Sequence, residues 1–458
     1  MKSRVTFVGT GVLIGLVIGL GFYFYGTDAP QYTQTPVEPG GVQVTVDADG
    51  KPNGKYFKYR THRFDEDLTD EQREQMKQLE AIGYADGSVA GDGRGHVTVH
   101  DRERAAAGYN FYCSGHGPEA VLMDMDGNEI HRWHHEFWET FPEYPLTEYH
   151  GGTNNFRRVM LLEGGDVIAI HEGLAAVRFD KDNKTKWSNP GRAHHDLDVH
   201  ENGDLYLLTR EAKMIYRLDL TQALLEDFVS IVDIDTGTEK RRISLIEALE
   251  KSQWADWLKE RSDRSDVFHT NTLSILDGTA SHPAFKAGNV LLSLRNMNML
   301  AVLDVHEGLF VWAHRGDYNI QHEPSITAAG DLLLFDNMGG RRGRKTRISL
   351  YEIPGMKARW HWNGGDVPLR SATLGTAAEL ANGNLLVTES ERGRAVEVTA
   401  DDREVVWEFI NPHTAGPNDE FIAAMFEMSR LPADFDVSWA KGSPTPAMQT
   451  RVQPFERK

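Results

Sequence analysis

A glycine turn followed by an apolar strand recurs six times along this 458-residue chain, and no other feature restricts its fold as strongly. The repeat glycines are residues 108, 165, 203, 288, 330 and 383, so the successive steps are 57, 38, 85, 42 and 53 residues. Periods near 40–50 residues, each with several short strands, are typical of propeller blades. The turn-and-strand units span 107–112, 164–170, 202–208, 287–292, 329–335 and 382–387.

Further strand signals follow each unit. Second strands are predicted at 120–124, 176–180, 215–219, 301–304 and 395–398. The chain is therefore predicted to be all-β, a six-bladed β-propeller whose blades leave a central channel. A β-sandwich with irregular strands is the competing fold, but it does not explain why tryptophan recurs in the outer strands, as Trp133, Trp187, Trp312, Trp360 and Trp407.

The remaining segments are arranged around the propeller, which is predicted at residues 96–435. A charged segment near 221–264 fills the step of 85 residues and has the composition of a helical insertion. Residues 27–95 form a predicted tether and N-terminal segment, which is rich in Pro, Gly, Gln and Thr from about 27 to 55. Strong helix formers predict a helix near 67–82. Residues 436–458 are a C-terminal tail.

The N-terminal residues resemble a targeting signal. An apolar run of 21 residues, Val5 to Tyr25, is long enough to cross a bilayer as a helix, and it follows Lys2 and Arg4. By the positive-inside rule, the N-terminus stays in the cytoplasm and the rest of the chain is exported. Residues 1–26 are therefore predicted to be a transmembrane signal-anchor, with the propeller on the periplasmic or extracytoplasmic side. A cleaved signal peptide is the competing interpretation. Small-xxx-small glycine spacings in the run leave a homo-oligomer open.

Composition excludes several classes of partner and cofactor. The chain has 49 Lys and Arg against 68 Asp and Glu, a formal charge of −19, whereas a nucleic-acid partner needs a basic face. Cys113 is the single cysteine, so an intrachain disulfide and cysteine-rich metal sites are excluded. No G-x-x-x-x-G-K-[ST] loop occurs, so a nucleotide-phosphate site is not indicated.

The 19 histidines are chemically the most informative residues, because the repeat gives several of them a common register. His195 and His322 each lie eight residues before the glycine of their unit, and His269 opens the corresponding segment of the unit between them. Because equivalent blade positions face the axis in the same way, these side chains are predicted to meet at one channel mouth. His150 begins the segment of the second unit in a looser register, fifteen residues before Gly165.

Two chemistries suit such a set of imidazoles. They can be metal ligands, or they can act as nucleophile and general acid or base because their pKa lies near working pH. Arg295, at the end of an inner strand, favours the second chemistry, because a guanidinium disfavours a nearby divalent metal but suits an oxyanion. The residues thus favour a histidine nucleophile that acts on an anionic group without a metal or cofactor.

Residues from about 95 to 435 resemble the bacterial arylsulfotransferases, a family of nucleotide-independent aryl sulfate ester transferases. The motifs that carry the resemblance are His194-His195-Asp-Leu-Asp with its Asn202-Gly203 turn, Phe268-His-Thr-Asn271, Ser293-Leu-Arg295-Asn, Gln321-His322-Glu and Asp336-Asn337-Met-Gly339.

The resemblance implies a six-bladed propeller that moves a sulfuryl group from an aryl sulfate ester to a phenol. It implies that His322 is the nucleophile, transiently sulfurylated, and that His195 and His269 assist by proton transfer and charge stabilisation. Asn271 and Arg295 are implied ligands of the sulfuryl oxygens, with Thr376 a further candidate. A covalent intermediate of this kind predicts ping-pong kinetics, and donors aimed at the sulfuryl oxygens would stabilise the transfer state.

Two other functions stay open on the sequence. One is a metal-dependent propeller hydrolase or oxidoreductase that uses the same histidines. The other is a non-catalytic propeller whose channel or rim binds a ligand. Metal content, turnover and saturable binding distinguish the three.

Overall fold

The structure is a computed structural model that describes residues 54–58, 96–144, 151–261, 265–339, 345–365, 367–415 and 421–440. The chain divides into two units, Met1–Pro36 and Val37–Lys458, and all described residues belong to the second. The predicted signal-anchor at 1–26 and the predicted helix at 67–82 lie outside the described residues. In the part of the chain that is described, no helix is long and apolar enough to cross a membrane.

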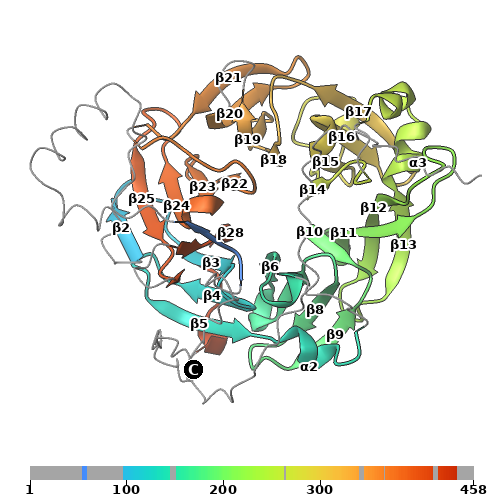
Figure 1. Cartoon of the computed structure of the whole chain (residues 1–458). Helices are drawn as coiled ribbons and strands as arrows, with labels where there is room; N and C mark the ends of the chain where they lie inside the picture. The colour runs from blue at the N-terminus through green and yellow to red at the C-terminus, as the bar shows by residue number, and fades with distance from the viewer. Residues whose placement is uncertain are drawn as a thin grey trace, which may run out of the picture. The chain divides into compact units, whose positions relative to one another are not determined.

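Six antiparallel sheets of the second unit surround a common centre (Figure 1). The first sheet contains, from the centre outwards, β28 (Met425–Leu431), β3 (Tyr109–Ser114), β4 (Glu119–Met123) and β5 (Glu129–His134). The second contains β6 (Arg158–Leu161), β7 (Val167–His171), β8 (Ala175–Phe179) and β9 (Thr185–Asn189). The third contains β10 (Ala193–Val199), β11 (Asp204–Lys213), β12 (Leu224–Asp233) and β13 (Glu239–Ser244).

The remaining sheets follow the same order. The fourth contains β14 (Thr270–Ile275), β15 (Val290–Leu294), β16 (Met299–Asp304) and β17 (Leu309–Arg315). The fifth contains β18 (His322–Ile326), β19 (Leu332–Gly339), β20 (Lys345–Glu352) and β21 (Lys357–Trp362). The sixth contains β22 (Thr376–Glu379), β23 (Leu385–Glu389), β24 (Arg394–Val398), β25 (Val405–Ile410) and, on its outer edge, β2 (His96–His100).

The predicted β-propeller is therefore confirmed, because every turn-and-strand unit forms the second strand of its sheet. Gly203 and Gly330 each turn the chain between an innermost strand and the next strand with φ of 82°, a conformation that glycine adopts without steric cost. Strands β7, β15 and β23 are buried along their whole length, as expected of strands packed between neighbouring sheets.

The recurrent tryptophans connect neighbouring sheets. The indole N–H of Trp133 donates to the carbonyl of Gly165 in the next sheet at 3.0 Å, and that of Trp187 donates to Ile234 at 2.8 Å. Trp360 and Trp407 repeat the contact on the far side of the ring, to the carbonyls of Ala400 and Met125. A buried indole needs such an acceptor, which explains why tryptophan recurs at this position.

The predicted insertion near 221–264 is helical only in its second half. Its first half contributes β12 and β13, and the helical part is α3 (Leu245–Glu250) followed by the 3-10 helix η4 (Ala255–Glu260). The strand predicted at 215–219 is a turn, because β11 is ten residues long and the hairpin reverses only after it. Part of the charge that suggested a helix lies on β13, an exposed edge strand with four consecutive charged residues.

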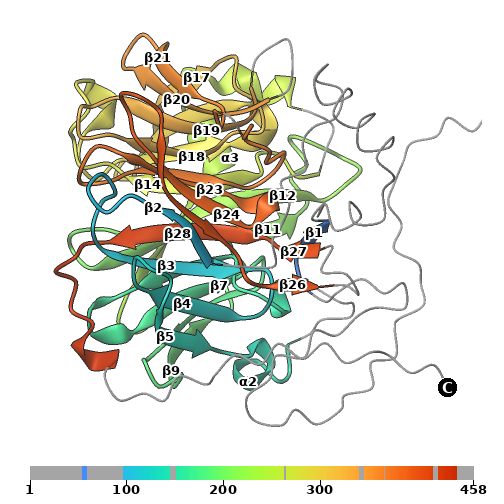
Figure 2. The same ribbon diagram turned by 90° about the vertical axis from the view of Figure 1, so that its left-hand side faces the viewer.

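A late strand closes the ring, and a small sheet lies beside it. β28, near the C-terminal end of the described residues, pairs with β3 and so joins the last part of the chain to the first sheet. β27 (Phe421–Ala423), which precedes it, forms a small sheet with β1 (Tyr56–Lys58) and β26 (Thr414–Ala415), at one side of the propeller sheets (Figure 2). β27 ends at Ala423 and β28 begins at Met425. The small sheet therefore lies at the end of the propeller where the innermost strand β28 starts.

Candidate active site

The predicted histidines stand at the starts of consecutive innermost strands. His195 is in β10, His269 directly precedes β14, and His322 is the first residue of β18. The strand pairing of each of these three strands shifts register at this point, and His195 and His269 have φ of 55° and 47°. Such bulges redirect side chains and are common beside active sites. The rings of His195 and His269 are 5.0 Å apart between centroids.

The hydrogen bonds of His322 define which ring nitrogen is available. Nδ1 lies 2.9 Å from the carbonyl oxygen of Ile320 and 2.8 Å from Oδ1 of Asn337. The Asn337 amide is oriented by its Nδ2, which donates to the carbonyls of Ser371 and Leu374, so Oδ1 must face the histidine. Both neighbours of Nδ1 are acceptors, so Nδ1 carries the proton and Nε2 has a free lone pair.

Burial keeps His322 neutral. It lowers the pKa of the imidazole to about 3; the hydrogen bond that His322 donates to Asn337 opposes this shift, and the charges of Arg157 and Arg295 add to it. His322 is 4% exposed. A neutral imidazole with a free Nε2 is the form that can act as a nucleophile.

His269 is bonded to an acidic residue. Its Nδ1 lies 2.6 Å from Oδ2 of Asp266, and its backbone N–H donates to Oδ1 of the same carboxylate at 3.0 Å. Burial raises the pKa of Asp266, but the hydrogen bonds and charge of His269 outweigh this and lower it. The carboxylate therefore orients the ring, which leaves Nε2 for proton transfer.

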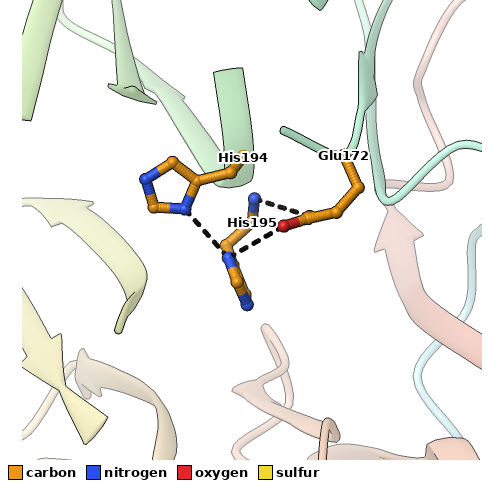
Figure 3. Close-up of side chains that lie close together, drawn as sticks. All are labelled: Glu172, His194 and His195. Carbon is orange, nitrogen blue, oxygen red and sulfur yellow. Dashed lines mark hydrogen bonds and ion pairs between the residues drawn. The ribbon is translucent and has the colours of Figure 1, made fainter. Parts of the chain in front are cut away.

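His195 belongs to a second cluster, formed with His194 and Glu172 (Figure 3). Its Nδ1 lies 2.9 Å from Nδ1 of His194 and 3.3 Å from Oε1 of Glu172, and its backbone N–H donates to Oε2 of Glu172 at 3.0 Å. Burial, and then the charge of Arg157, hold the pKa of His195 well below its usual value. This imidazole is therefore neutral at working pH.

One ligand atom from each of Glu172, His194 and His195 lies within 4.8 Å of the others, which is compatible with a metal ion. The charges nearby are less favourable. Glu172 faces the guanidinium of Arg157 at 3.7 Å and that of Arg210 at 3.8 Å. Two cations already neutralise this carboxylate, so the cluster suits an anion better than a divalent cation.

Arg157 is a site residue that the sequence prediction missed. It immediately precedes β6, is 7% exposed, and its charge acts on both His195 and His322. It lies eight residues before Gly165, the same spacing that places His195 and His322 before their glycines. The shared spacing could have identified it, whereas His150, the histidine considered for this sheet, lies outside the described residues.

The predicted sulfuryl ligands are placed differently from one another. Arg295 begins the 3-10 helix η6 (Arg295–Met297) after β15, and its charge acts on His322. Asn271 is buried, and its Nδ2 donates to the carbonyl of Gln321 at 2.8 Å, so it holds the backbone that leads into His322. Thr376 begins β22 and pairs with Thr388, and within the described residues none of its hydrogen bonds joins it to the three histidines.

An ion-pair cluster lies beside the histidines. The guanidinium of Arg158 contacts Asp196 at 2.7 Å, Glu323 at 2.7 Å and Glu427 at 3.1 Å. Asp196 follows His195 and Glu323 follows His322 in the sequence, so the two acidic side chains turn away to a common arginine. The negative charge of Glu323 is thereby directed away from an anion at His322.

Fold and site together define a β-propeller enzyme whose channel mouth is lined by histidine and arginine. The chain belongs to the arylsulfotransferase (ASST) family, whose model matches residues 158–412, more than half of its length. Members of this family are enzymes, and membership indicates arylsulfate sulfotransferase activity with small aryl sulfates and phenols as substrates. The resemblance seen in the sequence motifs is therefore confirmed, and Arg157 lies directly before the matched region.

Other comparisons add little. No curated protein matches the chain. Among solved structures, a protein of unknown function from Bacteroides caccae is 11% identical, with a TM-score of 0.46 over 70% of this chain and 98% of that one. The Cps50 (Swd1) β-propeller domain of Myceliophteria thermophila is 13% identical, with a TM-score of 0.40 over 73% of this chain and 97% of that one. Likenesses this weak do not bear on function.

Proposed function

We propose that this protein is a six-bladed, nucleotide-independent sulfotransferase that forms a covalent intermediate on Nε2 of His322. The observation that carries the proposal is the pair of acceptor oxygens on Nδ1 of His322, which leaves Nε2 as a neutral nucleophile. In the first step the Nε2 lone pair forms a bond to sulfur. The bond between sulfur and the aryl oxygen breaks, and its electron pair stays on that oxygen.

The leaving phenolate needs a proton, and His269 is the better donor. The carboxylate of Asp266 lies 2.6 Å from its Nδ1, whereas burial and the charge of Arg157 hold His195 neutral. In the second step the neutral His269 removes the proton of the acceptor phenol, whose oxygen attacks sulfur. The N–S bond then breaks and its electron pair returns to Nε2 of His322, so each cycle restores both imidazoles.

The sulfuryl oxygens carry negative charge throughout this transfer. Arg157 and Arg295 both act electrostatically on His322, so they are placed to stabilise charge that develops there. His195, neutral and close to His269, supplies a polar neighbour to the same space. Asn271 supports the reaction by fixing the Gln321–His322 backbone.

The decisive experiment uses a chromogenic aryl sulfate with and without an added phenol. Wild-type protein should release the chromophore faster with the phenol present and should carry a sulfuryl group on His322 when it is quenched without acceptor. His322→Ala should lose both properties. His306→Ala, a histidine whose side chain is 90% exposed, is the matched control and should keep them. Equal release by wild type and His322→Ala contradicts the covalent mechanism.

The cluster of Glu172, His194 and His195 supports a second candidate, a metal-dependent hydrolase or oxidoreductase. Stoichiometric metal in purified protein, with activity lost to a chelator and restored by the metal, would favour it. Under the proposed sulfotransferase mechanism a chelator has no effect, and Glu172→Gln does not change the metal content.

We also propose that residues 1–26 anchor the protein and place the propeller outside the cytoplasm. The support is the apolar run that follows Lys2 and Arg4. Protease added to intact cells with a permeabilised outer envelope should degrade the propeller while the inner membrane remains sealed. Protection of the propeller until that membrane is lysed contradicts the placement.

A further inference from the structure

Lys55 directly precedes β1 of the small sheet at the histidine end of the channel, and it lies more than a hundred residues before the region that the family model matches. Its backbone is held on both sides. Its N–H donates to the carbonyl of Gly115 at 2.8 Å, and its carbonyl accepts the N–H of Ala424 at 2.8 Å. These bonds attach Lys55 to the end of β3 and to the residue before β28.

Two glycines make room for this attachment. A Cβ on Gly115 would lie 2.3 Å from the carbonyl oxygen of Lys55 and 2.8 Å from its Cβ. Gly54 has φ of 112°, and a Cβ there would lie 2.3 Å from the carbonyl oxygen of Gly115. A larger residue at either position would displace the segment, so the location of Lys55 is defined by close backbone packing.

The side chain of Lys55 faces the same aromatic ring as Arg157. Its ammonium lies 5.6 Å from the ring centroid of Phe426, and the guanidinium carbon of Arg157 lies 5.5 Å from that centroid. Phe426 is 1% exposed and belongs to β28, the innermost strand of the first sheet. The ring thus holds two cations at the mouth where the histidines lie.

The electrostatic surroundings of Lys55 link it to the site residues. Burial and then the charge of Arg157 lower the pKa of Lys55 to about 8, while Glu172 and Glu391 oppose the shift. Arg157 and Glu172 are also the neighbours of His195. The residue itself is exposed to solvent, and among the described residues no carboxylate forms an ion pair with its ammonium.

We propose that Lys55 is a substrate-binding residue, whose ammonium acts with Arg157 to bind the sulfate group of the aryl sulfate donor. The inference rests on the proposed function, because it assigns the donor subsite of that reaction. Three observations support it. The backbone of Lys55 is held by two hydrogen bonds, its ammonium and the guanidinium of Arg157 lie over the same Phe426 ring, and the residue is exposed to solvent. A lysine that merely covers apolar surface with its stem is the competing explanation.

The test compares Lys55→Met, which keeps the stem and removes the charge, with Lys55→Arg, which keeps the charge. Lys55→Met should raise the KM for an aryl sulfate roughly tenfold or more, as expected for a lost charge-assisted contact, with a smaller change in kcat. Lys55→Arg should restore much of the affinity. Lys181→Met, which removes a lysine that pairs with its neighbour Asp182, is the matched control.

The pH dependence gives a second measurement. The donor KM of wild type should rise above about pH 8, where the Lys55 ammonium loses its proton. Lys55→Met should lack this rise, and so should Lys55→Arg, because a guanidinium stays charged. A merely structural role would lower the Tm of Lys55→Met without affecting KM.

If Lys55→Met turns over the aryl sulfate with an unchanged KM, the assignment of Lys55 is overturned. The proposed function still stands in that case, because the aryl sulfate is turned over. If wild type does not turn over the aryl sulfate, the proposed function fails. Binding of p-nitrobenzenesulfonate, a non-transferable analogue, then tests Lys55 by calorimetry. Weaker binding by Lys55→Met supports the subsite, and equal binding by both proteins overturns it.

Discussion

Arg158 and Glu323 come from sheets on opposite sides of the ring and meet in an ion pair of 2.7 Å (Figure 1). β6 and β18, which carry them, are the innermost strands of the second and fifth sheets. The pair therefore crosses the channel and joins the His322 segment to the opposite side. Asp196, which follows His195, binds the same guanidinium at 2.7 Å. One arginine thus fixes the backbone next to two of the three histidines.

The first prediction concerns Arg158→Met. It leaves the buried carboxylate of Asp196 and the half-buried carboxylates of Glu323 and Glu427 without their common cation. Losing one partner of a buried ion pair costs about 3–5 kcal/mol. We expect a large loss in the free energy of unfolding at pH 8 and a smaller loss at pH 5, where the carboxyls can protonate. Chemical denaturation at both pH values measures it. Arg104→Met, which removes an exposed ion pair, should change little, and equal effects of the two substitutions contradict the prediction.

The second prediction concerns Glu427. Burial raises the pKa of its carboxyl to about 7; the charge of Arg158 opposes this rise and that of Glu323 adds to it. The folded protein therefore holds a proton that the unfolded chain releases above its ordinary pKa of 4.5. Stability contributed by this group is present below pH 4.5 and is lost as pH rises toward 7, by at most about 1.4 kcal/mol per pH unit.

Glu427→Gln should abolish that loss. Its free energy of unfolding should exceed that of wild type at pH 8 and approach it at pH 5, because the amide imitates the protonated carboxyl. Denaturant titrations across this range measure the slope. Glu404→Gln, at an exposed carboxylate, serves as the control, and an unchanged slope in Glu427→Gln would show that Glu427 ionises normally.

The third prediction concerns Asn337, which accepts the Nδ1 proton of His322. Asn337→Asp places a negative charge beside the ring and should raise the pKa of His322 from about 3. The nucleophile must be neutral, so transfer activity should fall at acidic pH in this variant while wild type keeps it. Asn337→Ala should lower kcat by about a hundredfold, because the tautomer is no longer fixed. A pH–rate profile identical to that of wild type in Asn337→Asp excludes this role.

The sequence predicted the fold more completely than the site. The repeat glycines and tryptophans predicted the propeller, because each marks one sheet. The eight-residue spacing placed His195 and His322 correctly, yet Arg157 was missed since its sheet carries a different residue type at that position. The spacing alone does not identify chemistry.

Contacts between distant segments could not be predicted at all. Arg158 and Glu323 are 165 residues apart, and their pairing depends on which sheets lie opposite each other once the ring closes. The closing strand, β28, was not predicted: the sequence of 421–428 is compatible with a helix, and that interpretation is wrong because β27 and β28 lie there. Lys55 directly precedes β1, a strand of three residues whose position depends on its pairing with β27.

The last prediction concerns Arg157, the missed residue of the eight-residue register. Its charge lowers the pKa of both His195 and His322. Arg157→Met should therefore raise both pKa values and move any acid limb of the pH–rate profile to higher pH. It should also lower kcat, because the sulfuryl oxygens lose a cation while charge develops on them, by about a hundredfold. The control is Arg178→Met, which breaks the ion pair between Arg178, on β8, and Asp166 and leaves the histidines unchanged. If Arg157→Met alters KM alone, the guanidinium binds the donor equally in ground and transition states and contributes nothing to the chemical step.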